Sequence, residues 1–129
     1  MSTTATTKTV NRGSANREQD LKKSLKIKID ILKRLHKDYE YYQKEQKSQI
    51  ELIERFKNDA AKDEYDVKKQ EEILEENKTM IVDTIKRITA AITTCTEFMV
   101  EHEEKSDELE QWNEALELVD KYSDEFIKE

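Results

Sequence analysis

Histidine, cysteine and paired carboxylates are the side chains in this sequence that could carry chemistry. They could serve as metal ligands, as a nucleophile with its base, or as an acid–base pair. The chain contains two histidines, His36 and His102, and one cysteine, Cys95. A zinc site needs three or four clustered ligands, and a cysteine nucleophile needs a neighbouring base. The spacing supplies neither, because antiparallel helices would hold His36 far from His102 and would leave Cys95 on an apolar stripe.

Adjacent carboxylates occur at Glu71–Glu72, Glu75–Glu76 and Glu103–Glu104. Each pair falls on outward positions of an expected helix, where charge is solvated and no cleft forms. A glycine-rich phosphate loop is also excluded, because Gly13 is the only glycine in the chain. We therefore predict a protein that is not an enzyme, with no metal site and no cofactor.

The composition indicates which elements must carry any other function. The chain has 129 residues, of which 41% are charged and 35% hydrophobic, and it contains no proline. Ala, Glu, Lys, Leu and Arg together make up 59 residues, close to the half that is typical of long helices and coiled coils. Sheet folds need frequent turns, and turns draw on Gly and Pro. The fold class predicted is all-α, an elongated, coiled-coil-like antiparallel three-helix bundle with a short third helix.

The organisation along the chain follows from where the apolar spacing of three and four begins and breaks. The first 17 residues are rich in Thr and Ser and contain no acidic residue, which predicts a disordered N-terminal tail over residues 1–16. Asp63 and Asp66 are suited to the start of the second helix, since carboxylates favour the positive helix end. The bundle is expected over 17–129, with helices at about 17–58, 64–104 and 107–128.

Short connections make neighbouring helices antiparallel. Folding the first two helices back on each other places Phe56 by Val67 and Gln46 by Asn77. The third helix is too short to reach the turn, so the bundle should have a three-helix body and a two-helix tip. The tip contains polar residues at positions where the first two helices face each other, whereas the body should bury Leu116 and other large apolar side chains. These polar residues are Gln46, Gln49, Gln70 and Asn77.

The apolar stripe of the second helix is wider than a pair of helices requires. Ile73 and Met80 flank its central positions, together with Ile85, Ile92 and Met99. A stripe of this width predicts that the helix touches two neighbours.

Charge is distributed unevenly along the chain. Residues 1–58 carry 14 basic and 8 acidic side chains, whereas residues 59–129 carry 9 basic and 22 acidic ones. The basic run at 22–37 is either a solvated helix face or a docking face for an acidic partner. The net negative charge of the chain argues against nucleic acid as a partner. The acidic C-terminal third argues against binding to a membrane surface. No apolar run approaches the roughly 18 residues that a membrane span needs.

Two motifs resemble the tubulin-binding cofactor A family. Ile27-Lys28-Ile29 followed by Leu32-Lys33-Arg34-Leu35 is similar to the first-helix signature of that family. The segment Tyr65–Leu74, with the sequence YDVKKQEEIL, is similar to its segment at the start of the second helix. The likeness covers residues 25–98, and the third helix matches only in pattern. The family often has a proline where this chain has Ile81-Val82-Asp83, so a straighter second helix is expected.

The resemblance implies a three-helix bundle that acts as a chaperone for β-tubulin. Such a protein captures quasi-native β-tubulin after its release from the cytosolic chaperonin, and passes it on for assembly into the α/β heterodimer without a nucleotide of its own. It implies a cytoplasmic, cytoskeleton-associated protein, and admits other tubulin-folding cofactors as partners. The candidate contact residues are Lys33, Arg34, Lys37, Tyr41, Tyr65, Asp66, Lys68, Lys69 and Gln70.

Two further interpretations stay open at this point. The chain could be a generic helical adaptor, or a coiled-coil dimerisation module of a trafficking or membrane-associated protein. The sequence also allows weak pairing of two copies through the uncovered two-helix tip.

Overall fold

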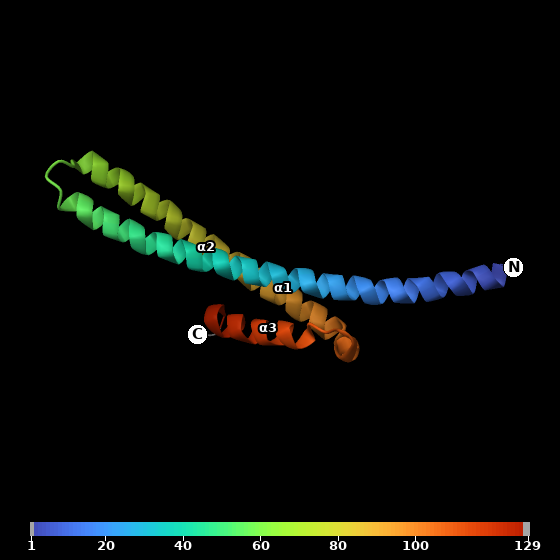
Figure 1. Cartoon of the computed structure of the whole chain (residues 1–129). Helices are drawn as coiled ribbons and strands as arrows, with labels where there is room; N and C mark the ends of the chain where they lie inside the picture. The colour runs from blue at the N-terminus through green and yellow to red at the C-terminus, as the bar shows by residue number, and fades with distance from the viewer. Residues whose placement is uncertain (1, 128–129) are drawn as a thin grey trace. The chain divides into compact units, whose positions relative to one another are not determined.

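The structure is a computed structural model that describes the backbone of residues 2–127 and the side chains of residues 16–127. The described chain forms three α-helices and one 3-10 helix, with no strand, which confirms the predicted all-α class (Figure 1). Within it, no helix combines the length and apolar character that a bilayer crossing requires. The elements are α1 (Ser2–Lys57), α2 (Glu64–Glu101), the 3-10 helix η1 (Glu103–Glu108) and α3 (Trp112–Phe126).

Helix α1 begins at Ser2, whereas the sequence predicted a helix from about residue 17. Residues 2–16 of the predicted tail, 1–16, therefore lie within the helical backbone. Almost all of its side chains, those of residues 1–15, lie outside the described part of the chain, so the disorder of this segment stays a prediction.

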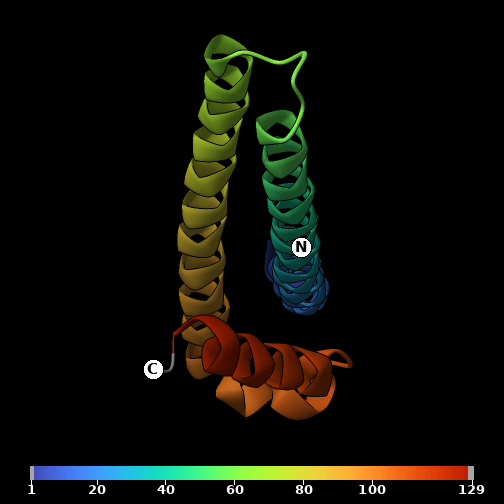
Figure 2. The same ribbon diagram turned by 90° about the vertical axis from the view of Figure 1, so that its left-hand side faces the viewer.

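The described chain divides into two compact units. Residues 33–90 form a helical hairpin, called here the hairpin unit, in which the second part of α1 and the first part of α2 run antiparallel (Figures 1 and 2). The other unit, called here the terminal unit, combines residues 1–32 with 91–129 and contains all of α3. The hairpin unit thus draws on two helices, in line with the two-helix tip expected from the sequence.

The hairpin turn is organised by three aspartates. The Asp59 carboxylate accepts a hydrogen bond from the Ala61 backbone N–H at 2.9 Å, which starts the reversal. Asp63 and Asp66 then cap α2 reciprocally, because each carboxylate accepts the backbone N–H of the other residue, at 3.0 and 3.2 Å. This arrangement is a capping box with aspartate at both positions. It explains why α2 begins at Glu64, the residue expected from the sequence.

Two amide contacts set the register of the hairpin. The Asn77 side-chain amide donates to the Tyr42 carbonyl at 3.1 Å. Gln49 donates to both the backbone carbonyl and the side-chain oxygen of Gln70, at 2.9 Å each. The carbonyl of a helical residue points toward the residue four positions on, so Asn77 contacts α1 within the turn that ends at Gln46, the predicted neighbour.

The C-terminal part of the terminal unit differs from the prediction of a third helix from 107 to 128. Residues 103–108 form a 3-10 turn, Leu109 is extended and buried, and α3 starts afresh at Trp112 (Figure 2). The helical spacing of apolar residues is therefore interrupted at this turn. Helix α3 buries Ala115 and Tyr122, and it leaves Leu116 47% exposed, so the core placement predicted for Leu116 is wrong.

The core of the terminal unit surrounds Cys95, which is fully buried. Burial raises the pKa of the Cys95 thiol, and the nearby Lys28 ammonium partly opposes this effect. The Lys28 Nζ lies 4.8 Å from the centre of the Phe98 ring and donates a hydrogen bond to the Ser24 hydroxyl at 2.7 Å. Cys95 accordingly behaves as a small apolar core residue.

This burial predicts the reactivity of the thiol. In the folded chain at pH 8, Cys95 should react with Ellman's reagent at least about a hundredfold more slowly than in the urea-unfolded chain, because the core must first open. Absorbance of the released thiolate measures both rates. Equal rates in the two states would show that Cys95 is accessible and would contradict its placement in the core.

Candidate functional site

The predicted basic stretch of α1 forms an exposed stripe on the hairpin unit. Lys33, Arg34, Lys37 and Tyr41 are all exposed. Spacings of four residues place Lys33, Lys37 and Tyr41 on one side of the helix, and Arg34 joins them three residues before Lys37. Tyr41 is 58% exposed and meets the Tyr42 ring edge-on, with ring centres 5.6 Å apart. These four side chains are called here the basic stripe.

Glu45, one turn along α1, acts on the hydroxyl of Tyr41. Their hydrogen bond and the negative charge of Glu45 raise the pKa of Tyr41. The phenol therefore stays neutral at physiological pH, and its ring is an exposed apolar surface beside basic side chains. Such a surface suits contact with a protein.

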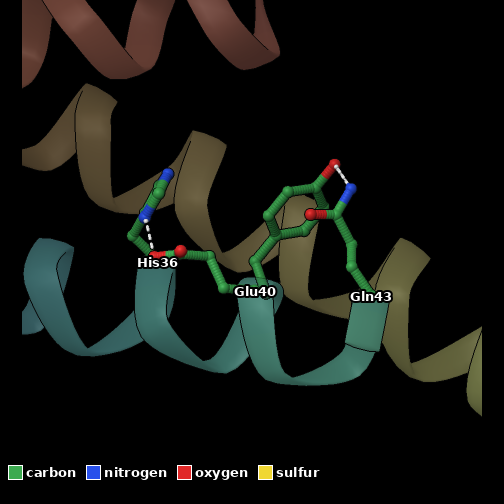
Figure 3. A network of polar contacts seen from close by, with 4 residues as sticks. His36, Glu40 and Gln43 are labelled. Carbon is green, nitrogen blue, oxygen red and sulfur yellow. Dashed lines mark hydrogen bonds and ion pairs between the residues drawn. The ribbon is translucent and has the colours of Figure 1, made fainter. Parts of the chain in front are cut away.

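Another face of the same helix carries the polar network in Figure 3. His36 Nδ1 lies 3.0 Å from a Glu40 carboxylate oxygen, and the Gln43 amide donates to the Tyr39 hydroxyl at 2.8 Å. Each contact joins residues one turn apart, so the network braces α1 locally. The described residues contain no group of three or more side chains suited to hold a metal ion.

The predicted contact residues at the start of α2 divide into two groups. Tyr65, Lys68 and Lys69 are exposed, and the Lys69 Nζ lies 5.5 Å from the centre of the Tyr65 ring. Asp66 and Gln70 are partly buried and have partners inside the hairpin, in the cap of α2 and in the amide contact with Gln49. These two side chains therefore fix the geometry of the hairpin.

The structure does not bring the two predicted sets together. Gln70 contacts Gln49, which lies eight residues beyond Tyr41 on α1. At about 1.5 Å per residue, this offset is about 12 Å along the helix. The basic stripe and the α2 residues are therefore separate surfaces at different levels of the hairpin.

A groove of about 660 Å³ lies between α1 and α2 in the space that separates these two surfaces. Its apolar lining comes from Tyr41 and Leu52 on α1 and from Ile73 and Met80 on α2. Ile73 is 46% exposed and Met80 is 38% exposed. The other residues that line this groove, called here the hairpin groove, are Tyr42, Lys44, Glu45, Ser48, Gln49, Arg55, Glu76 and Asn77.

Sequence reasoning missed the groove, although it had the relevant signal. The apolar stripe of α2 was recognised as too wide for one neighbour, and Ile73 and Met80 were assigned to its flanks. The hairpin unit supplies only α1 as a neighbour, so this flank remains open. An open apolar groove beside an exposed basic stripe can bind another protein.

Comparisons with known proteins point to one family. The family model described as "Tubulin binding cofactor A" matches residues 20–119. A Dictyostelium discoideum protein named tubulin-specific chaperone A is 54% identical over 110 residues, which cover 85% of this chain and 97% of the relative. The crystal structure of tubulin folding cofactor A from Arabidopsis thaliana aligns with a TM-score of 0.72 and 29% identity, covering 82% of this chain and 98% of the other. Human tubulin chaperone cofactor A aligns with a TM-score of 0.64 and 34% identity, over 78% and 96% of the two chains.

Proposed function

The chain belongs to the tubulin binding cofactor A family, and we propose that it is a tubulin-folding cofactor for β-tubulin. It captures quasi-native β-tubulin after release from the cytosolic chaperonin and holds it for assembly into the α/β heterodimer. The observation that carries this proposal is the 54% identity to the Dictyostelium tubulin-specific chaperone A over 97% of that relative. The family match gives no support to the alternative of a generic adaptor or a trafficking coiled coil.

The hairpin unit supplies surfaces that suit this function. The basic stripe offers three cations and an aromatic ring, and the hairpin groove offers apolar side chains. The chain as a whole carries a net charge of −7, so a local basic surface is needed to attract an acidic client. Binding through fixed helix faces needs no nucleotide, cofactor or catalytic group, and we place this encounter in the cytoplasm, beside the microtubule cytoskeleton.

Capture from cytosol tests the proposal. The tagged chain, incubated with cytosolic extract and recovered, should retain β-tubulin in excess over α-tubulin on immunoblots, without added nucleotide. Recovery of α- and β-tubulin in equal amounts would indicate binding of the intact heterodimer and would contradict capture of β-tubulin alone.

The basic stripe should contribute long-range attraction to this capture. We expect the variant with Lys33→Glu and Arg34→Glu to bind β-tubulin roughly tenfold more weakly, because two favourable exposed pairs become repulsive. The salt dependence of its affinity should also be flatter, since salt screens fewer attractive contacts. Titration of labelled β-tubulin at two salt concentrations measures both effects.

The control for this variant is Lys22→Glu with Lys23→Glu. These two lysines are also adjacent and exposed on α1 but lie in the terminal unit, and the change in net charge is identical. An equal loss of binding in both variants would assign the effect to total charge and would remove the basic stripe from the interface.

A further inference from the structure

We propose that the hairpin groove binds an amphipathic helix of the client protein, with the apolar face of that helix against Ile73 and Met80 and an acidic edge along α1. The identity of the client as β-tubulin rests on the proposed function, whereas the chemistry of the bound segment follows from the groove itself.

The apolar side of the groove has the pattern of a helix-binding surface. Ile73 and Met80 lie seven residues apart on α2, with Asn77 between them, so all three share one face of the helix. Asn77 is 8% exposed and is anchored to the Tyr42 carbonyl, which fixes the base of the groove. Ile73 and Met80 are left without the second neighbour that so wide an apolar stripe requires. A helix from another protein can supply that neighbour.

The length of the groove matches a helix of a few turns. On α1 its lining runs from Tyr41 to Arg55, a span of 14 residues. At about 1.5 Å per residue, this span is about 21 Å, or roughly four helical turns. An amphipathic helix that lies in the groove can therefore present apolar side chains at positions i, i+4 and i+7.

The charged residues along the groove indicate which charge the bound helix should carry on the edge that faces α1. Lys44, Arg55 and Glu45 line the α1 side, which therefore carries one net positive charge. The α2 side contributes the acidic residue Glu76. A helix with acidic residues along the α1 edge complements this distribution, and one with basic residues there is repelled.

The test uses the full chain and a designed peptide. The probe is a fluorescently labelled peptide of about 14 residues, long enough for roughly four helical turns, with Leu at i, i+4 and i+7 and Glu along one edge. A scrambled peptide of the same composition is its control. Fluorescence anisotropy should show saturable binding of the designed peptide only. Absence of binding to the native chain, or equal binding of the scrambled peptide, overturns the proposal.

The matched variants locate the binding site. Ile73→Ala with Met80→Ala should weaken peptide binding at least tenfold, whereas Val82→Ala should not, because Val82 is also exposed on α2 but does not line the groove. Alanine favours helix, so both variants should retain the native circular dichroism spectrum. Lys44→Glu with Arg55→Glu tests the charged edge independently and should also weaken binding. Unchanged peptide binding in either groove variant contradicts the proposal.

A parallel titration with isolated β-tubulin separates this proposal from the proposed function. If β-tubulin binds the native chain and loses affinity in the Ile73→Ala/Met80→Ala variant, the groove is part of the client interface. If the peptide binds but β-tubulin does not, the groove stands and the tubulin-folding function fails. If β-tubulin binds the groove variant as tightly as the native chain, the groove is not its docking site, and the proposal is overturned for this client.

Discussion

Replacement of Ile29 by alanine is expected to lower the free energy of unfolding by about 2–5 kcal/mol. Ile29 lies on α1 in the terminal unit and has no exposed surface, so truncation removes buried methyl groups and leaves a cavity. Ile27 is the matched control, because it is the same residue type two positions earlier in the same helix and is 57% exposed. Ile27→Ala should change stability by only about 0.5 kcal/mol or less.

Urea unfolding followed by circular dichroism at 222 nm measures both variants. The midpoint for Ile29→Ala should fall well below that of the native chain, and the midpoint for Ile27→Ala should stay close to it. Equal midpoints for the two variants would mean that α1 presents a different face to the core from the one described here.

Asn77→Asp is expected to destabilise the hairpin unit by about 3–5 kcal/mol at pH 7, because it places a charge without a partner in a buried position. Asn77 is 8% exposed, and its Oδ1 is buried without a hydrogen-bond partner among the described residues. An aspartate at this position also loses the amide donor that binds the Tyr42 carbonyl. The carboxylate of the aspartate would then lie beside the Tyr42 carbonyl, and neither group can donate a hydrogen bond to the other.

The pH dependence of this variant distinguishes charge from packing. Burial should raise the pKa of the new carboxyl above its unfolded value of about 3.9. The folded state then binds the proton more tightly, so the destabilisation grows as the pH rises above about 4 and is smallest in acid. Asn77→Leu also loses the hydrogen bond to the Tyr42 carbonyl but carries no charge, so its cost should not depend on pH.

Urea unfolding at pH 4.5 and pH 7 measures the difference. Comparison of Asn77→Asp with Asn77→Leu at each pH cancels the titration of the rest of the chain. A gap between the two variants that does not change with pH would show that residue 77 is in contact with water.

Helix content and the hairpin turn were predictable because they depend on local features of the sequence. The absence of proline excluded breaks in the long helices, and the aspartates at 63 and 66 placed the start of α2 at the residue where the structure has it. The tubulin-binding cofactor A resemblance was also readable from two short motifs, and the family comparison confirms it.

Features that depend on packing between helices were not predictable to the same degree. The hydrogen-bond partners across the hairpin were not predictable, because the side-chain amides of Asn77 and Gln49 bond to backbone carbonyls, which periodicity does not indicate. Leu116 was placed in the core because it lies seven residues after Leu109, as on one face of a continuous helix. In the structure Leu109 lies before the start of α3, so the two residues do not share a helix face. Asp66 and Gln70 were predicted both as contact residues and as a helix-start residue and a residue between the two helices, and their hydrogen bonds in the structure lie within the hairpin.

The most direct test of the proposed function is a native gel of the purified chain with radiolabelled tubulin released from purified cytosolic chaperonin. Separate reactions contain labelled β-tubulin or labelled α-tubulin. We expect β-tubulin to move with this chain as a discrete complex after nucleotide is removed, and α-tubulin not to do so. Comigration of α-tubulin to the same extent, or no complex with either tubulin, would contradict it.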